Sequence, residues 1–95
     1  MAEQRKRIGV LGAGHLGRIH MQQALQVPDL ELIGFHDPDL EKAAQAALEH
    51  GVPALPTVRA LIDACDLVDI VTPTLSHYHL AIQALAAGKH VFIEK

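Results

Sequence analysis

A glycine-rich segment near the amino terminus, Gly12-Ala13-Gly14-His15-Leu16-Gly17, directly follows a short apolar run at residues 8–11. Asp37 lies twenty residues after the last glycine of this segment. In a strand–turn–helix–strand unit, the first glycine permits the tight turn and the second lets the backbone approach a diphosphate. The third glycine allows the helix to pack closely on the strand. The free N–H groups and positive dipole end of the helix then attract the diphosphate. This spacing predicts a dinucleotide site rather than a structural glycine turn.

Asp37 follows the expected second strand, where a carboxylate can accept hydrogen bonds from the ribose hydroxyl groups of adenosine. Asp-Pro-Asp is also a good turn and cap sequence, which is the alternative role for this residue. A carboxylate at this position repels a 2′-phosphate, and residues 38–41 include no Arg or Lys that would compensate. The sequence therefore predicts that NAD is preferred over NADP.

Strand patterns and amphipathic helix patterns alternate along the chain, with no internal repeat, low-complexity tract or linker. We expect helices at residues 14–27, 40–50, 58–64 and 76–88, and strands at residues 7–11, 30–36, 52–55, 67–72 and 90–94. Parallel strands need crossover connections, which are overwhelmingly right-handed. The sequence thus predicts one α/β domain over residues 1–95, a doubly wound parallel sheet with five strands in the order 3-2-1-4-5.

Local signals mark the ends of several elements. Asp39 and Thr57 are expected to cap the helices that follow them, and Ser76 is expected to open the last helix. Gly51 provides a helix exit. Pro53 and Pro56 place the expected third strand at the edge of the sheet.

Composition excludes several classes of function. The formal net charge of −3 gives no broad attraction for nucleic acid or for an anionic membrane. The single cysteine, Cys65, cannot form an intramolecular disulfide, and we expect it to pack in the interior. No apolar stretch approaches the ~20 residues needed to cross a bilayer, and the amino terminus has no hydrophobic signal core. We therefore expect a cytoplasmic protein.

Histidine-containing segments offer weaker signals. His77-Tyr78-His79 could suggest a metal site, but residues two apart on a helix do not face each other. No cysteine or acidic residue completes a ligand set at zinc spacing, so no metal is expected. His15 is expected to contribute its backbone N–H to phosphate binding. Arg18 is expected to lie on a solvated helix face.

Several spaced motifs together resemble the Gfo/Idh/MocA oxidoreductases. They are the segment at residues 8–14, Asp37, and the run Val71-Thr72-Pro73-Thr74-Leu75-Ser76-His77. The terminal residues His90-Val91-Phe92-Ile93-Glu94-Lys95 are similar to the strand that carries that family's Glu-Lys-Pro signature. The resemblance covers essentially the whole chain. The signature proline and the substrate-binding domain that normally follows are absent from these 95 residues. Family members are about three times as long.

The resemblance implies the cofactor half of an oxidoreductase that moves hydride between a nicotinamide cofactor and a sugar, inositol or polyol hydroxyl. Lys95 would position and polarise the substrate hydroxyl, and Glu94 would line the nicotinamide pocket. The Thr72-Pro73 turn would contact the nicotinamide half, with His77 close by. The cofactor-binding residues are thus predicted to be Gly12, Gly14, His15, Leu16, Gly17, Asp37, Thr72, Pro73, His77 and Glu94.

Two other functions remain open from the residues alone. One is a non-catalytic module that senses dinucleotide state or regulates a partner. The other is a different two-domain reductase on the same cofactor fold, such as a biliverdin-reductase-like or amino-acid-pathway enzyme. As the final residue, Lys95 is expected to fray, so we expect no turnover from these 95 residues alone.

The last expected strand has a consequence for assembly. Val91, Phe92 and Ile93 would form an apolar, unpaired sheet edge. Such edges pair with another copy, so a homodimer through this strand is expected.

Overall fold

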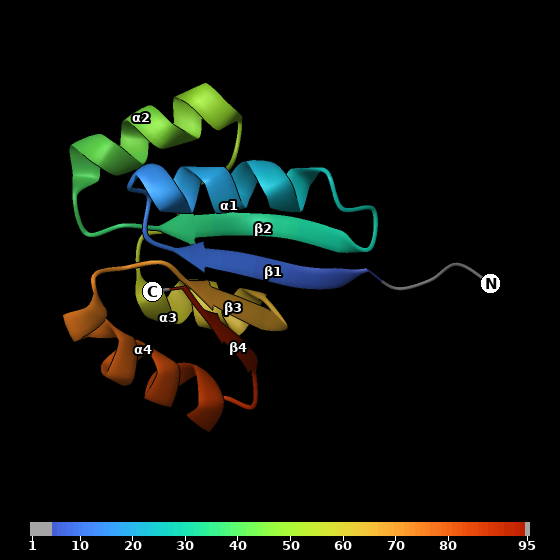
Figure 1. Ribbon diagram of the computed structural model, residues 1–95, viewed down its shortest axis with the longest axis vertical. Coiled ribbons are helices and arrows are strands. Elements are labelled where there is room, and N and C mark those ends of the chain that lie inside the picture. Colours follow the sequence, from blue (N-terminus) through green and yellow to red (C-terminus); the bar gives the residue numbers. More distant parts are fainter. Residues whose placement is uncertain (1–4, 95) are drawn as a thin grey trace.

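Strands and helices alternate through residues 5–94, the part of the chain that this computed structural model describes. In chain order the elements are β1 (Lys6–Leu11), α1 (His15–Leu25), β2 (Leu30–His36), α2 (Leu40–His50), α3 (Val58–Ala64), β3 (Leu67–Ile70), α4 (Thr74–Ala86) and β4 (His90–Ile93). The strands pair in parallel in the order β2-β1-β3-β4 (Figure 1). The predicted α/β architecture with a parallel sheet is therefore confirmed.

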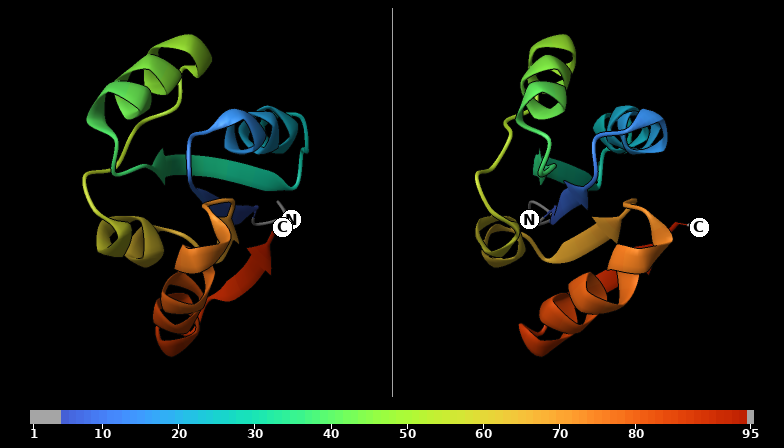
Figure 2. Two further views of the ribbon diagram at one scale, coloured as in Figure 1. Left: turned by 60° about the vertical axis from the view of Figure 1, so that its left-hand side comes forward. Right: turned by 90° about the vertical axis from the view of Figure 1, so that its left-hand side faces the viewer.

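Helices lie on both faces of the sheet (Figure 2). Helices α1 and α2 enclose one core with β1 and β2, and helices α3 and α4 enclose a second core with β3. Val10 and Leu11 are neighbours in β1, and their side chains enter different cores. This follows from the alternation of side chains along a strand. Strand β1 is thus buried from both sides, as the central strand of a doubly wound sheet must be.

The expected third strand at residues 52–55 is wrong, and so is the five-strand order. This segment makes only an isolated bridge between Ala54 and Phe35. Two backbone hydrogen bonds accompany it: Phe35 donates to the Pro53 carbonyl at 3.0 Å, and Leu55 donates to the Phe35 carbonyl at 2.7 Å. Pro53 and Pro56 have no N–H group, so neither can donate a hydrogen bond to a ladder. Within residues 5–94 the sheet therefore has four strands, in the order left when the expected edge strand is removed.

Most of the predicted helix ends are confirmed. The Asp39 carboxylate accepts a hydrogen bond from the backbone N–H of Lys42 at 3.1 Å, and the Thr57 hydroxyl accepts one from Ala60 at 3.0 Å. Gly51 ends α2 in the left-handed conformation, with φ of 66°. The expected opening of α4 at Ser76 is wrong. The helix begins two residues earlier, at Thr74, because the fixed φ of the preceding Pro73 already suits a helix entry.

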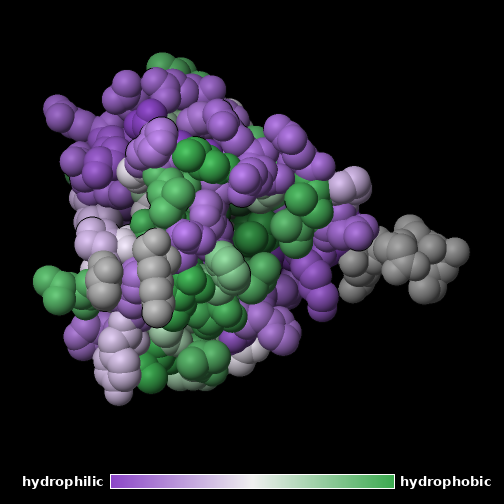
Figure 3. Space-filling model, in the orientation of Figure 1, coloured by the Kyte–Doolittle hydropathy of each residue, from purple (hydrophilic) through white to green (hydrophobic). Residues whose placement is uncertain are grey.

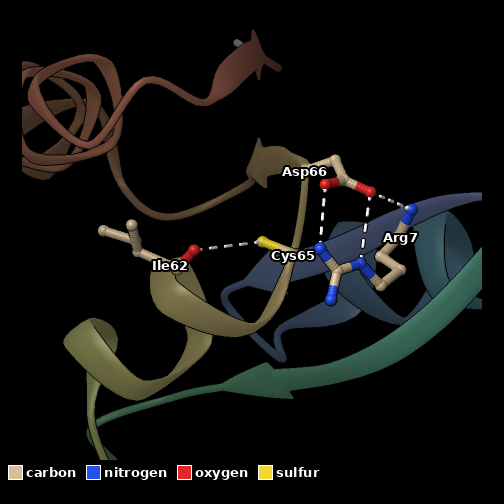
Figure 4. Close-up of polar contacts among 4 residues, drawn as sticks. All are labelled: Arg7, Ile62, Cys65 and Asp66. Atoms are coloured by element: carbon tan, nitrogen blue, oxygen red, sulfur yellow. Dashed lines mark hydrogen bonds and ion pairs between the residues drawn. The ribbon is translucent and has the colours of Figure 1, made fainter.

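An ion pair joins the beginnings of β1 and β3 at the amino end of the sheet (Figure 4). The Arg7 guanidinium donates two hydrogen bonds to the Asp66 carboxylate, at 3.0 and 3.2 Å, and the Arg7 backbone N–H donates a third at 3.0 Å. These bonds lower the pKa of Asp66 from 3.8 to about 2. Next to this pair, Cys65 is fully buried, which confirms its predicted packing role, and burial raises the pKa of its thiol.

The lowered pKa of Asp66 predicts an acid-dependent contribution to stability. Because the pKa is lower in the folded state, this contribution is present above pH ~4, the ordinary pKa of an unfolded aspartate, and is lost as the pH falls towards 2. We expect Asp66→Asn to lower the urea midpoint at pH 7, and the gap from the natural chain to narrow at pH 2.5. Urea titrations at both pH values measure this. An equal gap at the two pH values would contradict the ion pair.

Candidate functional site

A cleft opens where the carboxyl ends of β1, β2 and β3 meet. The chain leaves β1 towards β2 on one side and reaches β3 on the other, which creates a crevice at this edge of the sheet. The cleft has a volume of about 550 Å³. It is lined by Gly12, Gly14, His15, Leu16, Asp37, Pro38, Asp39, Lys42, Val71, Thr72, Pro73 and Ser76. Seven of the ten predicted cofactor-binding residues are therefore brought together in one cavity.

The glycines of the loop differ in what surrounds them. Gly12 has φ of 112°, and a Cβ atom there would lie 2.9 Å from the carbonyl oxygen of Val71. A Cβ atom on Gly17 would collide with the carbonyl oxygen of Gly12. Gly14 has no atom within 4 Å of such a position and lies at the wall of the cleft. Gly12 and Gly17 are thus required by the turn itself, whereas Gly14 leaves space for something outside the protein.

The Asp37 side chain fastens the glycine turn to the start of α2. One carboxylate oxygen accepts a hydrogen bond from the backbone N–H of Ala13 at 2.8 Å, and the other accepts one from Asp39 at 2.9 Å. The residue is only 8% exposed. Each carboxylate oxygen has two lone pairs, so both oxygens keep capacity for a further donor in the cleft.

Helix α1 points its amino end at the cleft. It begins at His15 after Gly14, and no side chain caps it. The first N–H groups of a helix have no partner within the helix, so an anion in the cleft can accept their hydrogen bonds. Arg18 was expected on a solvated face, but it connects the loop to α2. Its guanidinium donates to the Ala13 carbonyl at 3.2 Å and pairs with Glu49 at 2.6 Å.

The turn after β3 forms the opposite wall of the cleft. The buried hydroxyl of Thr72 has no hydrogen-bond partner within residues 5–94. A buried hydroxyl without a partner is costly, and one at a cleft wall fits a bound polar group. The His77 ring lies 2.7 Å, through Nε2, from the Thr72 carbonyl oxygen. His77 thus holds the turn and is not among the residues that line the cleft.

A second cavity of about 320 Å³ continues from the cleft across the ends of β1 and β2. Its lining is mostly apolar and comprises Leu11, His36, Pro38, Val58, Thr72, Leu75, Ser76, His79 and Leu80. Pro38, Thr72 and Ser76 belong to both cavities. A polar compartment beside an apolar one suits a ligand with phosphates at one part and a flat base at another.

Like Gly17 and His77, Glu94 does not line the cleft. Glu94 lines a different groove, where one of its carboxylate oxygens lies 3.6 Å from Nε2 of His20. Lys95 lies outside the described residues. Sequence reasoning also missed the pair that His20 forms with Asp69, at 2.6 Å between Nδ1 and the carboxylate. Its one signal was an acidic residue inside the otherwise apolar run at residues 67–71.

Two further classes of site were sought in residues 5–94. No group of three or more His, Cys, Asp or Glu side chains in this range could hold a metal ion. None of the helices there combines the length and apolar character needed to cross a membrane.

A doubly wound parallel sheet, a glycine turn and an uncapped helix end at the topological crevice define a dinucleotide-binding domain. Residues 6–95 match the family model described as "Oxidoreductase family, NAD-binding Rossmann fold". The chain therefore belongs to the Gfo/Idh/MocA oxidoreductase family and comprises its NAD-binding domain.

Similar proteins include several dehydrogenases. The chain is 45% identical over 89 residues to UDP-N-acetylglucosamine 3-dehydrogenase of Acidithiobacillus ferrooxidans, covering 94% of this chain and 28% of that protein. It is 37% identical over 97 residues to scyllo-inositol 2-dehydrogenase (NAD(+)) of Bacillus subtilis, covering 98% of this chain and 28% of that protein. The chain thus spans less than a third of the length of these relatives.

Solved structures of related proteins share the fold of this chain. The crystallised UDP-N-acetylglucosamine 3-dehydrogenase GnnA from Acidithiobacillus ferrooxidans superposes with a TM-score of 0.89 at 43% identity, covering 98% of this chain and 30% of that one. GenD2 from gentamicin A biosynthesis, in complex with NAD, superposes with a TM-score of 0.89 at 27% identity, covering all of this chain and 28% of that one.

Proposed function

We propose that this chain binds NAD in the cleft, as the cofactor domain of a dehydrogenase. The observation that carries this proposal is the open space beside Gly14 at the amino end of α1. There the backbone N–H groups of His15 and Leu16 donate to the diphosphate, and the missing side chain of Gly14 lets it approach. The apolar cavity between Pro38 and Leu80 takes the adenine ring.

The Asp37 carboxylate has two tasks in this arrangement. It holds Ala13 and Asp39 in place, and it accepts hydrogen bonds from the ribose hydroxyl groups through its remaining lone pairs. Lys42 lines the same cleft, but its single positive charge is smaller than the two negative charges of Asp37 and Asp39. The local charge is therefore negative and repels a 2′-phosphate, so we propose that NAD is preferred over NADP.

Calorimetric titration with each cofactor tests this assignment. We expect Asp37→Ala to weaken NAD binding by about tenfold to a hundredfold, since hydrogen bonds to a charged group are lost. The difference between the affinities for NAD and for NADP should be smaller in the same variant. Asp63→Ala is the matched control, because it removes one exposed carboxylate on α3, away from the cleft. Equal affinity of the natural chain for NAD and NADP would contradict the role of Asp37.

For the complete protein, we propose hydride transfer between the nicotinamide ring and the hydroxyl-bearing carbon of a sugar, inositol or polyol, while the hydroxyl group exchanges its proton with a base. The names of the relatives support this class, since two of them are dehydrogenases of UDP-N-acetylglucosamine and of scyllo-inositol. NAD would supply the hydride acceptor, and Lys95 would position the substrate hydroxyl. We expect no NADH formation by the 95-residue chain alone, because the relatives are more than three times as long. Absorbance at 340 nm measures this.

Two further proposals concern self-association of the chain and its location in the cell. Among the strands of residues 5–94, β4 lies at the edge of the sheet beside β3, and its Phe92 and Ile93 are 54% and 38% exposed. We propose that the 95-residue chain dimerises by pairing this edge with that of a second copy. A sedimentation coefficient that corresponds to a monomer at every concentration would contradict it. We also propose a cytoplasmic location, where the single Cys65 stays reduced.

A further inference from the structure

A histidine on helix α1 lies between two carboxylates that come from different parts of the chain. Nδ1 of His20 is 2.6 Å from Oδ2 of Asp69 in β3, and its Nε2 is 3.6 Å from Oε1 of Glu94, which directly follows β4. All three side chains line the groove of about 320 Å³ beside α1. Among the described residues that line this groove, no other side chain is titratable. The cluster thus connects α1 to β3 and to the end of β4.

Asp69 fixes the orientation of the histidine ring. It is only 5% exposed, and its Oδ1 has no hydrogen-bond partner within residues 5–94. Burial raises the pKa of the Asp69 carboxyl, and the hydrogen bond with His20 opposes this shift. A buried carboxylate that loses its donor is costly. The bond to Nδ1 therefore keeps the ring in place, with Nε2 turned towards Glu94.

Apolar side chains surround the cluster. The His20 side chain is 13% exposed, and its ring centroid lies 6.3 Å from that of Phe92. Val27 and Leu30 also line the groove. Hydrophobic surface gathers over β4 and α4 beside α1 (Figure 3). Charges attract each other more strongly away from water, so a proton on the His20 ring acts strongly on its neighbours.

The number of protons on the ring decides how many carboxylates His20 can hold. An ionised carboxylate only accepts hydrogen bonds, so each of the two bonds needs its own N–H group. The doubly protonated ring has both. The neutral ring has one, and Asp69 takes it through Nδ1. Glu94, whose side chain is 36% exposed, then has no donor on His20 and can turn to water.

We propose that His20, oriented by Asp69, is a positioning residue for Glu94 and holds the Glu94 carboxylate only while its ring carries both protons. The family resemblance places Glu94 at the nicotinamide pocket, and Lys95 directly follows it. The proton on His20 thus decides whether the Glu94 side chain stays in the groove or is free to move towards the cofactor. This consequence rests on the proposed function, whereas the contact between His20 and Glu94 does not require NAD.

Thermal unfolding of the 95-residue chain without NAD tests the contact. The ordinary pKa of histidine is ~6.5 and that of glutamate is ~4.3, so a histidine–glutamate pair is fully charged near pH 5 and loses its cation by pH 8. The stabilisation is therefore present below pH ~6.5 and lost above it. We expect Glu94→Gln to lower Tm by about 3 °C at pH 5 and to leave it nearly unchanged at pH 8.

Two further variants make this test specific. In a His20→Asn background, Glu94→Gln should leave Tm unchanged at both pH values, because the asparagine amide can donate to Asp69 but is too short to reach Glu94. Asp63→Asn is the matched control: Asp63 pairs with Arg59 at 3.3 Å, and arginine keeps its charge at both pH values. Its fall in Tm should not change with pH. An equal effect of Glu94→Gln at pH 5 and pH 8 would overturn the proposal.

Carbon-13 NMR of the natural chain gives a second test that depends on no variant. Besides its own titration, the carboxyl carbon of Glu94 should show a second step at the pH where the His20 ring titrates. His20→Asn should remove that step. A Glu94 signal that titrates in one step in the natural chain would overturn the proposal. Both tests are made without cofactor, so their failure is distinguishable from a failure to bind NAD in calorimetric titration.

Discussion

Gly14→Val is expected to abolish measurable NAD binding and to leave the fold intact. The backbone at Gly14 is extended, with φ of −73° and ψ of −169°, a conformation that valine adopts readily. A Cβ atom there would meet no protein atom within 4 Å. The branched side chain would instead occupy the side of the cleft where the diphosphate approaches α1. We expect a loss of affinity of about a hundredfold or more, measured by calorimetric titration.

A control must separate this loss from a change in stability. Gly14 is the N-cap of α1, and replacing it there costs no more than about 1 kcal/mol. Gly51→Ala is a suitable comparison, because φ of 66° penalises any side chain by about 1–2 kcal/mol at a position remote from the cleft. We expect Gly51→Ala to lower Tm and to bind NAD normally. Unchanged affinity in Gly14→Val would mean that the diphosphate does not lie against Gly14.

Gly17→Ala is expected to have the opposite profile, with a large loss of stability. A Cβ atom at Gly17 would overlap the carbonyl oxygen of Gly12. The obstacle is backbone, so no rotamer change relieves it and the turn has to move. Overpacking of this kind costs about 3 kcal/mol, which corresponds to a fall in Tm of about 15 °C for a domain of this size. Calorimetric melting of the free chain measures it.

Gly14→Ala is the matched variant for this test, since it adds the same methyl group three residues earlier in open space. Its Tm should stay within a few degrees of that of the natural chain. If Gly17→Ala and Gly14→Ala have the same Tm, the close approach of α1 to the turn does not hold in solution.

Local sequence signals predicted most of the fold. The alternation of strands and helices and the caps at Asp39 and Thr57 were confirmed. A cap is a hydrogen bond between residues three apart, so the chain needs nothing distant to form it. The structure also places the glycine loop at the strand–helix turn where its spacing predicts it. Glycine spacing reports backbone geometry directly, because only glycine avoids the contacts made at positions 12 and 17.

Tertiary structure decided the features that join distant parts of the chain. The Ala13 N–H reaches Asp37 across 24 residues, and His20 reaches Asp69 across 49. Both depend on strand pairing and on how α1 sits against the sheet, and no local pattern encodes either. The predicted third strand at residues 52–55 is wrong for a local reason: Pro53 and Pro56 have no N–H group to donate to a ladder, and the segment makes only an isolated bridge. By itself the sequence determined the order of elements and the glycine turn, through bonds between near neighbours. The groove beside His20 and the double bonding of Asp37 exist only where the folded sheet brings remote residues together.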